Sequence, residues 1–272
     1  MTTSALVTAN GEQRIRIGRH RLRVQLVGEG APLLLLMGIG GNLEMWEPLR
    51  RALPGHRLIA FDAPGTGGSS TPRVPLRMAG VARLTAELIG ELGYDAVDVL
   101  GVSWGGALAQ QLAISAPSRI RRLVLAATTP GLGGVPGRPG AMWVLMTPRR
   151  YYSRSYFESV APKLYGGRIK REPELLRQQA MARLTRPPTM AGYAGQLYAI
   201  TTFSSIPFLR CIKAPTLVLA GDDDPIVPMV NARILQRGIK DAELHVVRGG
   251  GHLFIFESVD EVGPVITRFL AP

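Results

Sequence analysis

A serine set between glycines, at the junction of an apolar strand and a helix, limits what this chain can fold into more than any other feature. Residues 101–105 read GVSWG and fit the pattern G-x-S-x-G. The residues before Ser103 predict a buried strand over 97–101, and those after it predict a helix over 104–115. A turn this sharp strains the central residue and needs small neighbours so that strand and helix can approach. It would expose the Ser103 oxygen at the carboxyl edge of a sheet.

Strand and helix patterns alternate along most of the chain, whose 272 residues suit one α/β domain with an insertion. Arginines alternating with aliphatic residues predict two short strands joined at Gly18-Arg19. The predicted strands are 14–17, 21–27, 32–37, 57–62, 97–101, 123–127, 216–220 and 243–247. The predicted helices are 78–92, 104–115, 230–236 and 259–270. This order predicts the α/β class, with a mostly parallel sheet, right-handed crossovers and helices on both faces.

Residues 131–210 interrupt this alternation. The segment follows Pro130 with a Gly- and Pro-rich connector and then carries many tyrosines and arginines. We interpret it as a helical cap inserted into a core made of residues 1–130 and 211–272. Its aromatic side chains, Trp143 and Tyr198 among them, are expected to face a substrate with alkyl side chains.

His252 is the expected partner of Ser103. Of the four histidines, His20 and His56 are predicted in turns, and His245 lies inside a predicted strand. His252 follows three glycines directly after the last predicted strand. It would therefore lie at the carboxyl edge of the sheet, where open α/β sheets bind their ligands.

An acid is expected between Ser103 and His252 in chain order. Three aspartates, Asp222, Asp223 and Asp224, follow the predicted strand 216–220. Any of them could accept a hydrogen bond from the imidazole and fix its tautomer. The residue pattern alone leaves all three open.

These residues predict nucleophilic catalysis on an acyl group. Ser103 would attack the carbonyl carbon, His252 would take the proton, and an acyl-enzyme would form. The Trp104 amide, at a helix N-terminus, would stabilise the developing negative charge, and the loop after strand 32–37 offers the Ile39 amide as the second donor. No cofactor is expected, because the glycines at 38–41 and 65–68 lack the dinucleotide and phosphate-loop spacings.

The formal net charge is +12, but the arginines are scattered and no nucleic-acid-binding signature accompanies them. A solvated basic surface is the first interpretation, and attraction to an anionic particle is the second. The single cysteine, Cys211, excludes an intrachain disulfide, a C-x-x-C redox pair and a cysteine-rich zinc site. Residues 1–13 carry no pattern of a secretory signal, and the longest apolar run, 31–39, is too short to span a bilayer. We therefore expect a cytoplasmic protein without a metal site or a transmembrane segment.

The ordered set of motifs resembles the α/β-hydrolase superfamily, and most of all the intracellular medium-chain-length poly(3-hydroxyalkanoate) depolymerases. The similar segments are 61–70 (FDAPGTGGSS), 101–111 (GVSWGGALAQQ), 217–228 (LVLAGDDDPIVP) and 251–254 (GHLF). The acid of the superfamily often stands in D-x-x-V-P, which Asp224 alone fits here, so the resemblance implies the triad Ser103, Asp224 and His252. Many relatives have His-Gly where this chain has Met37-Gly38.

The resemblance implies hydrolysis of the ester bonds of storage polyesters, and association with their granules. A small-molecule esterase or lipase and a carbon–carbon bond hydrolase would use the same triad. A catalytically silent binding protein on the same fold is a different class of hypothesis. The sequence predicts neither an oligomeric state nor a preferred acyl chain length.

Overall fold

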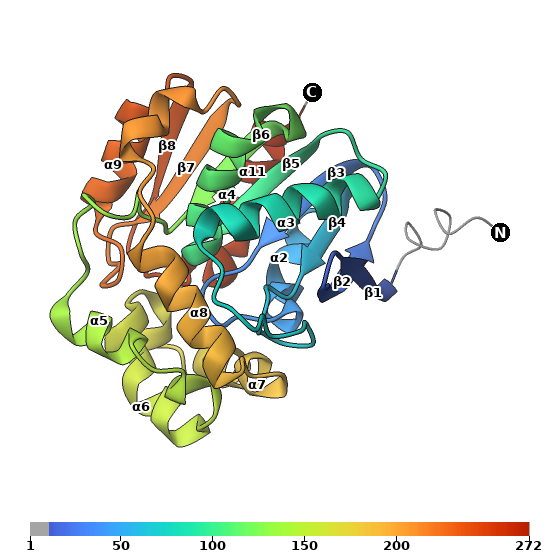
Figure 1. Ribbon diagram of the computed structural model, residues 1–272. Coiled ribbons are helices and arrows are strands. Elements are labelled where there is room, and N and C mark those ends of the chain that lie inside the picture. Colours follow the sequence, from blue (N-terminus) through green and yellow to red (C-terminus); the bar gives the residue numbers. More distant parts are fainter. Residues whose placement is uncertain (1–10, 272) are drawn as a thin grey trace.

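The computed structural model describes residues 11–271, and an eight-stranded sheet runs through them (Figure 1). Residues 1–10, part of the stretch in which the sequence predicts no secretory signal, lie outside the described residues, as does residue 272. The strands are β1 (Gly11–Ile17), β2 (His20–Val27), β3 (Ala31–Leu36), β4 (His56–Phe61), β5 (Val97–Val102), β6 (Ile120–Ala126), β7 (Thr216–Gly221) and β8 (Ala242–Val247). Their order in the sheet is β1-β2-β4-β3-β5-β6-β7-β8.

Most of the sheet is parallel, as predicted. Strands β4, β3, β5, β6, β7 and β8 form parallel pairs, whereas β2 pairs antiparallel with both of its neighbours, β1 and β4, near one edge of the sheet. The central strand β5 is buried along its whole length, as expected for a strand covered on both faces. The strand that leads to Ser103 therefore lies in the middle of the molecule.

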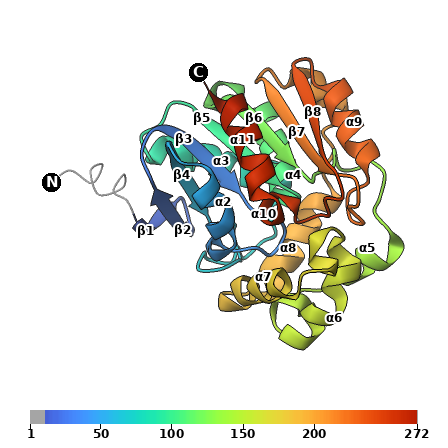
Figure 2. The same cartoon turned by 180° about the vertical axis from the view of Figure 1, so that it is seen from behind.

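Helices cover both faces of the sheet. Helices α3 (Met78–Glu91), α4 (Trp104–Ser115) and α9 (Met229–Gly238) share one apolar core with the sheet, and Figure 1 shows α3 and α4 in front of it. Helices α2 (Glu47–Ala52), α10 (Phe254–Glu257) and α11 (Val259–Leu270) share the other core, and Figure 2 shows α2 and α11 on that side. Two short 3-10 helices, η1 (Leu43–Trp46) and η2 (Pro117–Arg119), directly precede α2 and β6, respectively.

Four helices are inserted between β6 and β7. They are α5 (Pro139–Leu145), α6 (Arg154–Tyr165), α7 (Pro173–Thr185) and α8 (Met190–Thr201), with the 3-10 helices η3 (Arg149–Tyr151), η4 (Arg168–Lys170) and η5 (Ile206–Cys211). Two of them begin at hydroxyl side chains that accept a backbone N–H, Ser153 before α6 and Thr189 before α8. Figures 1 and 2 both show these inserted helices gathered at one end of the sheet.

The structure differs from the sequence prediction around residues 43–61. The predictions contain no helix there, whereas η1 and α2 lie between β3 and β4. His56, predicted in a turn, is the buried first residue of β4 and pairs with Ala31. The reason is that pairing with β3 starts immediately after the tight turn at Pro54-Gly55.

Over residues 11–271, none of the helices combines the length and the apolar character needed to cross a bilayer.

Candidate active site

Ser103 occupies a strained turn between β5 and α4. Its φ of 55° and ψ of −117° lie in a region that residues with a Cβ rarely adopt. A methyl group added at Gly105 would lie 2.0 Å from the carbonyl oxygen of Leu36, and one at Gly101 would lie 2.4 Å from the oxygen of Gly105. The two glycines of the motif are thus required by the close approach of strand and helix, as the sequence predicts.

The turn is fixed by hydrogen bonds on both sides of Ser103. The Ser103 amide donates to the carbonyl of Ala126 at 2.9 Å, and the Thr128 hydroxyl donates to the Ser103 carbonyl at 2.7 Å. Trp104 is the first residue of α4, so its amide belongs to the positively polarised N-terminus of that helix.

His252 follows β8 on a loop of three glycines, and its ring reaches Ser103. The Nε2 atom lies 3.0 Å from the Ser103 Oγ, and the side chain is 6% exposed. The His252 amide donates to the carbonyl of Tyr165, at the end of the inserted helix α6, at 2.6 Å. The loop therefore packs between the sheet and the inserted helices.

Of the three aspartates, only Asp224 contacts His252. Its Oδ2 lies 2.7 Å from Nδ1 of the imidazole, and its Oδ1 accepts the amides of Ile226 and Val227 at 2.8 and 2.9 Å. With Nδ1 protonated, Nε2 is free to accept a proton. The carboxylate is held from both sides, so the imidazole has one favoured orientation.

The other two aspartates face different partners. Asp222 accepts the Gly249 amide at 2.6 Å. Asp223 accepts the Gly167 amide at 2.9 Å and pairs with Lys170 at 2.5 Å. The Lys170 ammonium is the main reason that the pKa of Asp223 lies below its ordinary value. Both carboxylates therefore tie loops together beside the site.

Ile39 lies in the loop after β3, and this loop approaches Ser103, since a methyl group added at the neighbouring Gly38 would lie 3.4 Å from the Ser103 Cβ. Its carbonyl accepts the Tyr151 hydroxyl at 2.5 Å, and the next amide, of Gly40, donates to the Gln196 side chain at 2.7 Å. Both partners belong to the inserted segment. The segment therefore holds the loop in which the Ile39 amide is placed.

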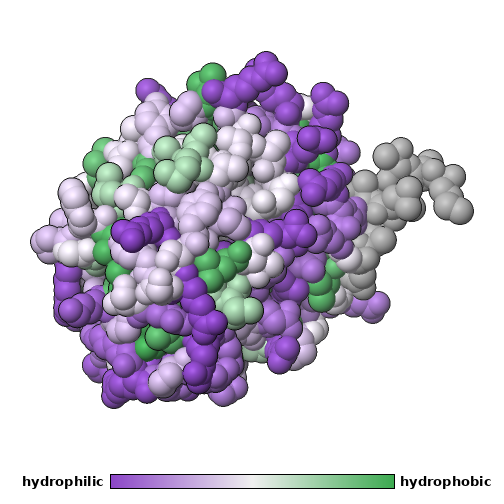
Figure 3. All heavy atoms as spheres, turned by 90° about the horizontal axis from the view of Figure 1, so that it is seen from below, coloured by the Kyte–Doolittle hydropathy of each residue, from purple (hydrophilic) through white to green (hydrophobic). Residues whose placement is uncertain are grey.

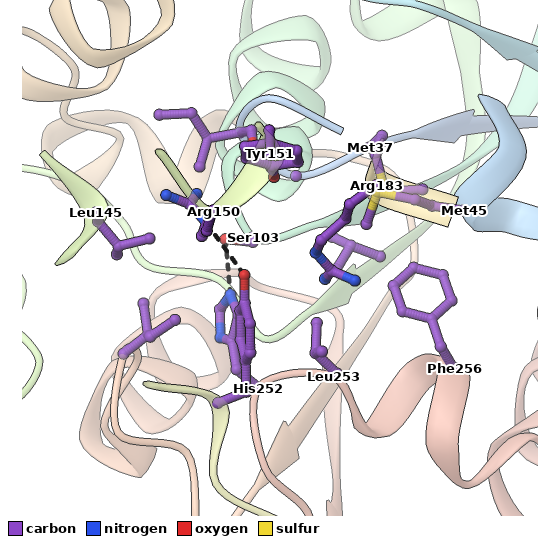
Figure 4. Close-up of a pocket in the computed structure, with 15 residues that line it drawn as sticks. Met37, Met45, Ser103, Leu145, Arg150, Tyr151, Arg183, His252, Leu253 and Phe256 are labelled. Carbon is purple, nitrogen blue, oxygen red and sulfur yellow. Dashed lines mark hydrogen bonds between the residues drawn. The ribbon is translucent and has the colours of Figure 1, made fainter. Parts of the chain in front are cut away.

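Two hollows meet at Ser103, and they differ in character. The smaller has about 430 Å³ of atom-free space and contains His252 and two arginines (Figure 4). The larger has about 1250 Å³ and is lined almost entirely by apolar side chains and glycines. Four residues line both: Ile39, Ser103, Leu145 and Ile226. A substrate could place one part on each side of the serine.

The aromatic walls predicted from the sequence are only partly present. Trp143 is 80% exposed, and neither it nor Tyr198 lines either hollow. Tyr151 and Tyr165 do line the smaller hollow. The prediction was wrong for Trp143 and Tyr198 because the apolar face of an inserted helix cannot be assigned before its neighbours are known. Aliphatic side chains and methionines line the larger hollow, among them Leu132, Met142, Leu145, Met146, Leu197 and Ile200.

Sequence reasoning missed the two arginines of the smaller hollow. Arg150 and Arg183 are each 1% exposed, although arginine is almost never fully buried without a partner. In Figure 4 both side chains extend into the hollow that contains Ser103 and His252. The only signal in the sequence is their position among tyrosines, which does not distinguish a buried arginine from a solvated one.

Glu257, at the end of α10, is a buried acid close to this hollow. Burial raises its pKa to about 7, although the Arg168 amide and guanidinium and the Arg183 guanidinium act in the opposite direction. Near neutral pH this carboxyl group is therefore only partly ionised.

Comparisons with known proteins agree with the fold and the motifs. Residues 31–259 match the family described as alpha/beta hydrolase fold. A crystal structure of a hydrolase from Pseudomonas aeruginosa PA01 superimposes with a TM-score of 0.81 at 28% identity, over 97% of this chain and 100% of that one.

Two related hydrolases match this chain over most of their length. The chain is 49% identical to a poly(3-hydroxyalkanoate) depolymerase of Ectopseudomonas oleovorans, over 88% of this chain and 84% of that protein. It is 30% identical to a 2-hydroxy-6-oxo-2,4-heptadienoate hydrolase of Pseudomonas putida, over 90% of this chain and 91% of that protein. These matches confirm the family resemblance stated from the sequence.

Proposed function

Because this chain belongs to the α/β-hydrolase family, we propose that it hydrolyses carboxylic esters through an acyl-enzyme formed on Ser103. The observation that carries this proposal is the continuous chain of contacts from Ser103 through His252 to Asp224. In this scheme His252 Nε2 takes the hydroxyl proton while Oγ attacks the ester carbonyl carbon. Asp224 orients the imidazole and stabilises its protonated form.

Acylation ends with proton transfer from His252 to the leaving alcohol, and deacylation by water follows. The protonated His252 gives its proton to the departing alcohol oxygen, and the acyl group remains on Ser103. Water then attacks the acyl carbon with His252 as the base, the bond between that carbon and Ser103 Oγ breaks, Oγ takes back the proton from His252, and the acid product leaves. We assign the amides of Trp104 and Ile39 to the oxyanion, because Trp104 follows Ser103 at a helix N-terminus and Ile39 lines both hollows together with Ser103.

We propose a poly(3-hydroxyalkanoate) as the ester. The 49% identity to a depolymerase supports this, and so does the larger apolar hollow at Ser103, which suits alkyl side chains. Residues 131–210 would act as a cap, since their helices line both hollows and hold the Ile39 loop. The depolymerase assignment implies a cytoplasmic enzyme that works at storage granules.

The mouth of the larger hollow has the character needed for contact with a polyester surface. Leu132, Val135 and Met146 line it and are exposed, and the exposed Trp143 lies on α5 between them in sequence. Figure 3 views the molecule from the side of the inserted helices and shows apolar patches set among strongly hydrophilic ones. The apolar residues would touch the polymer, and the basic surface would suit an anionic granule coat.

The test is a substrate panel. Purified granules of medium-chain and of short-chain polymer are compared with soluble p-nitrophenyl esters, and released 3-hydroxy acids are measured. Each additional buried CH₂ contributes up to ~0.8 kcal/mol, so two carbons would favour the medium-chain polymer by roughly tenfold if that binding is expressed in the transition state. Rapid cleavage of soluble esters with no release from either polymer would reject the depolymerase and leave a small-molecule esterase.

A carbon–carbon bond hydrolase is the second candidate. It is favoured by the 30% identity to the heptadienoate hydrolase, and the same three residues would serve it. Turnover of a 2-hydroxy-6-oxodienoate, with no action on esters, would support this candidate. A catalytically silent binding protein would turn over none of these substrates and would not be labelled by a fluorophosphonate.

A further inference from the structure

Arg150 is buried beside Ser103, and among residues 11–271 it has no acidic partner. Its guanidinium donates to three neutral oxygens: the hydroxyls of Tyr193 at 2.8 Å and Tyr165 at 3.1 Å, and the Thr147 carbonyl at 3.1 Å. It also lies 4.8 Å from the centre of the Tyr151 ring. Burial opposes the charged form, but the surrounding tyrosine hydroxyls keep the pKa of Arg150 above its ordinary value.

Arg183 approaches the same hollow from α7. It donates to the side chain and the carbonyl of Gln179 at 2.5 and 3.0 Å, and it lies 5.1 Å from the centres of the Phe157 and Tyr165 rings. Its buried Nε has no hydrogen-bond partner in the part of the chain that the structure describes. An orphaned guanidinium N–H that is shielded from water is costly unless something else accepts it.

The two positive charges are not neutralised by ion pairs. Within residues 11–271, neither arginine forms a salt bridge with a carboxylate. Glu257 interacts electrostatically with Arg183 but is itself only partly ionised near neutral pH. Removing charges from water without a counter-ion costs several kcal/mol each. A hollow built in this way at a reactive serine suits an anionic group of the substrate.

We propose that Arg150 and Arg183 form a subsite for the free carboxylate at the acid end of a polyester chain. The inference rests on the proposed polyester hydrolysis and specifies which ester bond is cut. In a 3-hydroxyacyl chain, the oxygen of the last ester bond is on the carbon next but one to the terminal carboxylate. With that carboxylate in the smaller hollow, the last ester bond lies beside Ser103, and the rest of the chain extends into the larger apolar hollow.

The cycle then removes one unit at a time. Ser103 Oγ attacks the carbonyl of the penultimate unit, the ester C–O bond breaks, and the terminal 3-hydroxy acid leaves with the proton from His252. Water releases the shortened chain from Ser103, and that step creates a new terminal carboxylate. One water is consumed for each monomer, and each turnover produces the group that the subsite recognises.

The test uses two soluble dimers of 3-hydroxyoctanoic acid that differ only at the acid end, one with a free carboxylate and one with a primary amide. Hydrogen bonds to charged groups are strong enough that the wild-type enzyme should have a kcat/KM for the free acid at least about tenfold higher than for the amide. In Arg183→Gln this ratio should fall toward one, and Arg183→Lys should restore part of it. The wild-type ratio needs no variant, so the test survives if Arg183→Gln fails to fold.

Arg149→Gln is the matched control. Arg149 precedes Arg150 in the same 3-10 helix, but it is exposed and lies over the Tyr156 ring outside the hollow, so its removal should leave the ratio at the wild-type value. Equal wild-type rates on the two dimers would overturn the subsite while leaving polyester hydrolysis intact. Cleavage of neither dimer, together with no release from granules, would overturn the proposed function itself.

Discussion

The main-chain carbonyl of Tyr165 accepts the amide hydrogen of His252 at 2.6 Å. This bond joins the end of an inserted helix to the residue that we propose as the catalytic base. The two rings also stack, with their centres 6.3 Å apart and their planes 16° from parallel. The inserted helices therefore position His252 as well as covering the site, and a disturbance at their junction should affect the chemistry.

Gly251→Ala should test that junction. A Cβ at this position would lie 2.3 Å from the Tyr165 carbonyl oxygen, so the His252 loop would have to move away. A misplacement of about 1 Å at a reacting group can cost on the order of 10²-fold in rate. We expect such a fall in kcat on a soluble ester with a normal circular dichroism spectrum. Gly249→Asn is the control, because nothing lies near that position and asparagine tolerates its positive φ; equal losses in the two variants would argue against a specific role of the junction.

The aspartates give a second prediction. Asp224→Asn should reduce kcat by on the order of 10⁴-fold, because an amide favours the wrong imidazole tautomer. Asp222→Asn and Asp223→Asn affect contacts with loop amides and ion pairs with Arg248 and Lys170, none of which involves His252, and should cost far less. Steady-state kinetics on a p-nitrophenyl ester would decide, and a loss confined to Asp222→Asn would refute the assignment of Asp224.

The positions of Ser103, His252 and the loop of three aspartates could be anticipated because local signals determine them, whereas the choice of Asp224 among the three came from the family resemblance. A strand-to-helix turn and two loops after parallel strands must meet at one sheet edge, whatever the details of packing. The helices 104–115 and 259–270 also begin and end where the sequence predicts. By contrast, α2 has only six residues, too few to show a helical period.

The character of the pocket could not be anticipated. Arg150 and Arg183 look like the solvated arginines elsewhere in the chain, and their burial depends on how α7 and η3 pack over the sheet. Trp143 gives the opposite error, since a tryptophan is expected to be buried and this one is 80% exposed. Both errors concern how the inserted segment packs against the rest of the protein. No hydrophobic periodicity in the sequence indicates that packing.

Trp143→Ala should separate granule hydrolysis from soluble-ester hydrolysis. The side chain is exposed and touches neither hollow, so we expect it to act by burial against the polymer. Burying a large apolar side chain is worth about 2 kcal/mol, which would lower the ratio of granule to soluble-ester turnover by up to about 30-fold. Met181→Ala is the control, because Met181 is also exposed but lies on α7, away from the mouth of the larger hollow. An unchanged ratio in Trp143→Ala would exclude this side chain from docking.

Glu257 should make stability depend on pH. Its pKa is about 7 in the folded protein and near 4.5 in the unfolded chain, so the folded state binds more protons between these values. The contribution of Glu257 to the free energy of unfolding is therefore fully present below pH 4.5 and is lost as the pH rises through 7. Glu257→Gln mimics the neutral acid and should remove this loss, which amounts to on the order of 3 kcal/mol. Denaturant unfolding at pH 5 and pH 8 would measure it, with the exposed Glu174→Gln as control; equal pH dependence in wild type and Glu257→Gln would contradict the shifted pKa.

Ser103 should show a conflict between stability and activity. Ser103→Ala should abolish fluorophosphonate labelling and lower turnover by at least ~10³-fold, as loss of a triad member does. The backbone at φ 55° and ψ −117° stays strained in that variant, because alanine keeps the Cβ. Ser103→Gly removes both the hydroxyl and the strain. Its free energy of unfolding, measured by denaturant titration, should exceed that of Ser103→Ala by about 1 kcal/mol, after the larger entropy loss of glycine is subtracted. If Ser103→Gly were the less stable of the two inactive variants, the turn would store no strain, and the two flanking glycines would be needed for close approach alone.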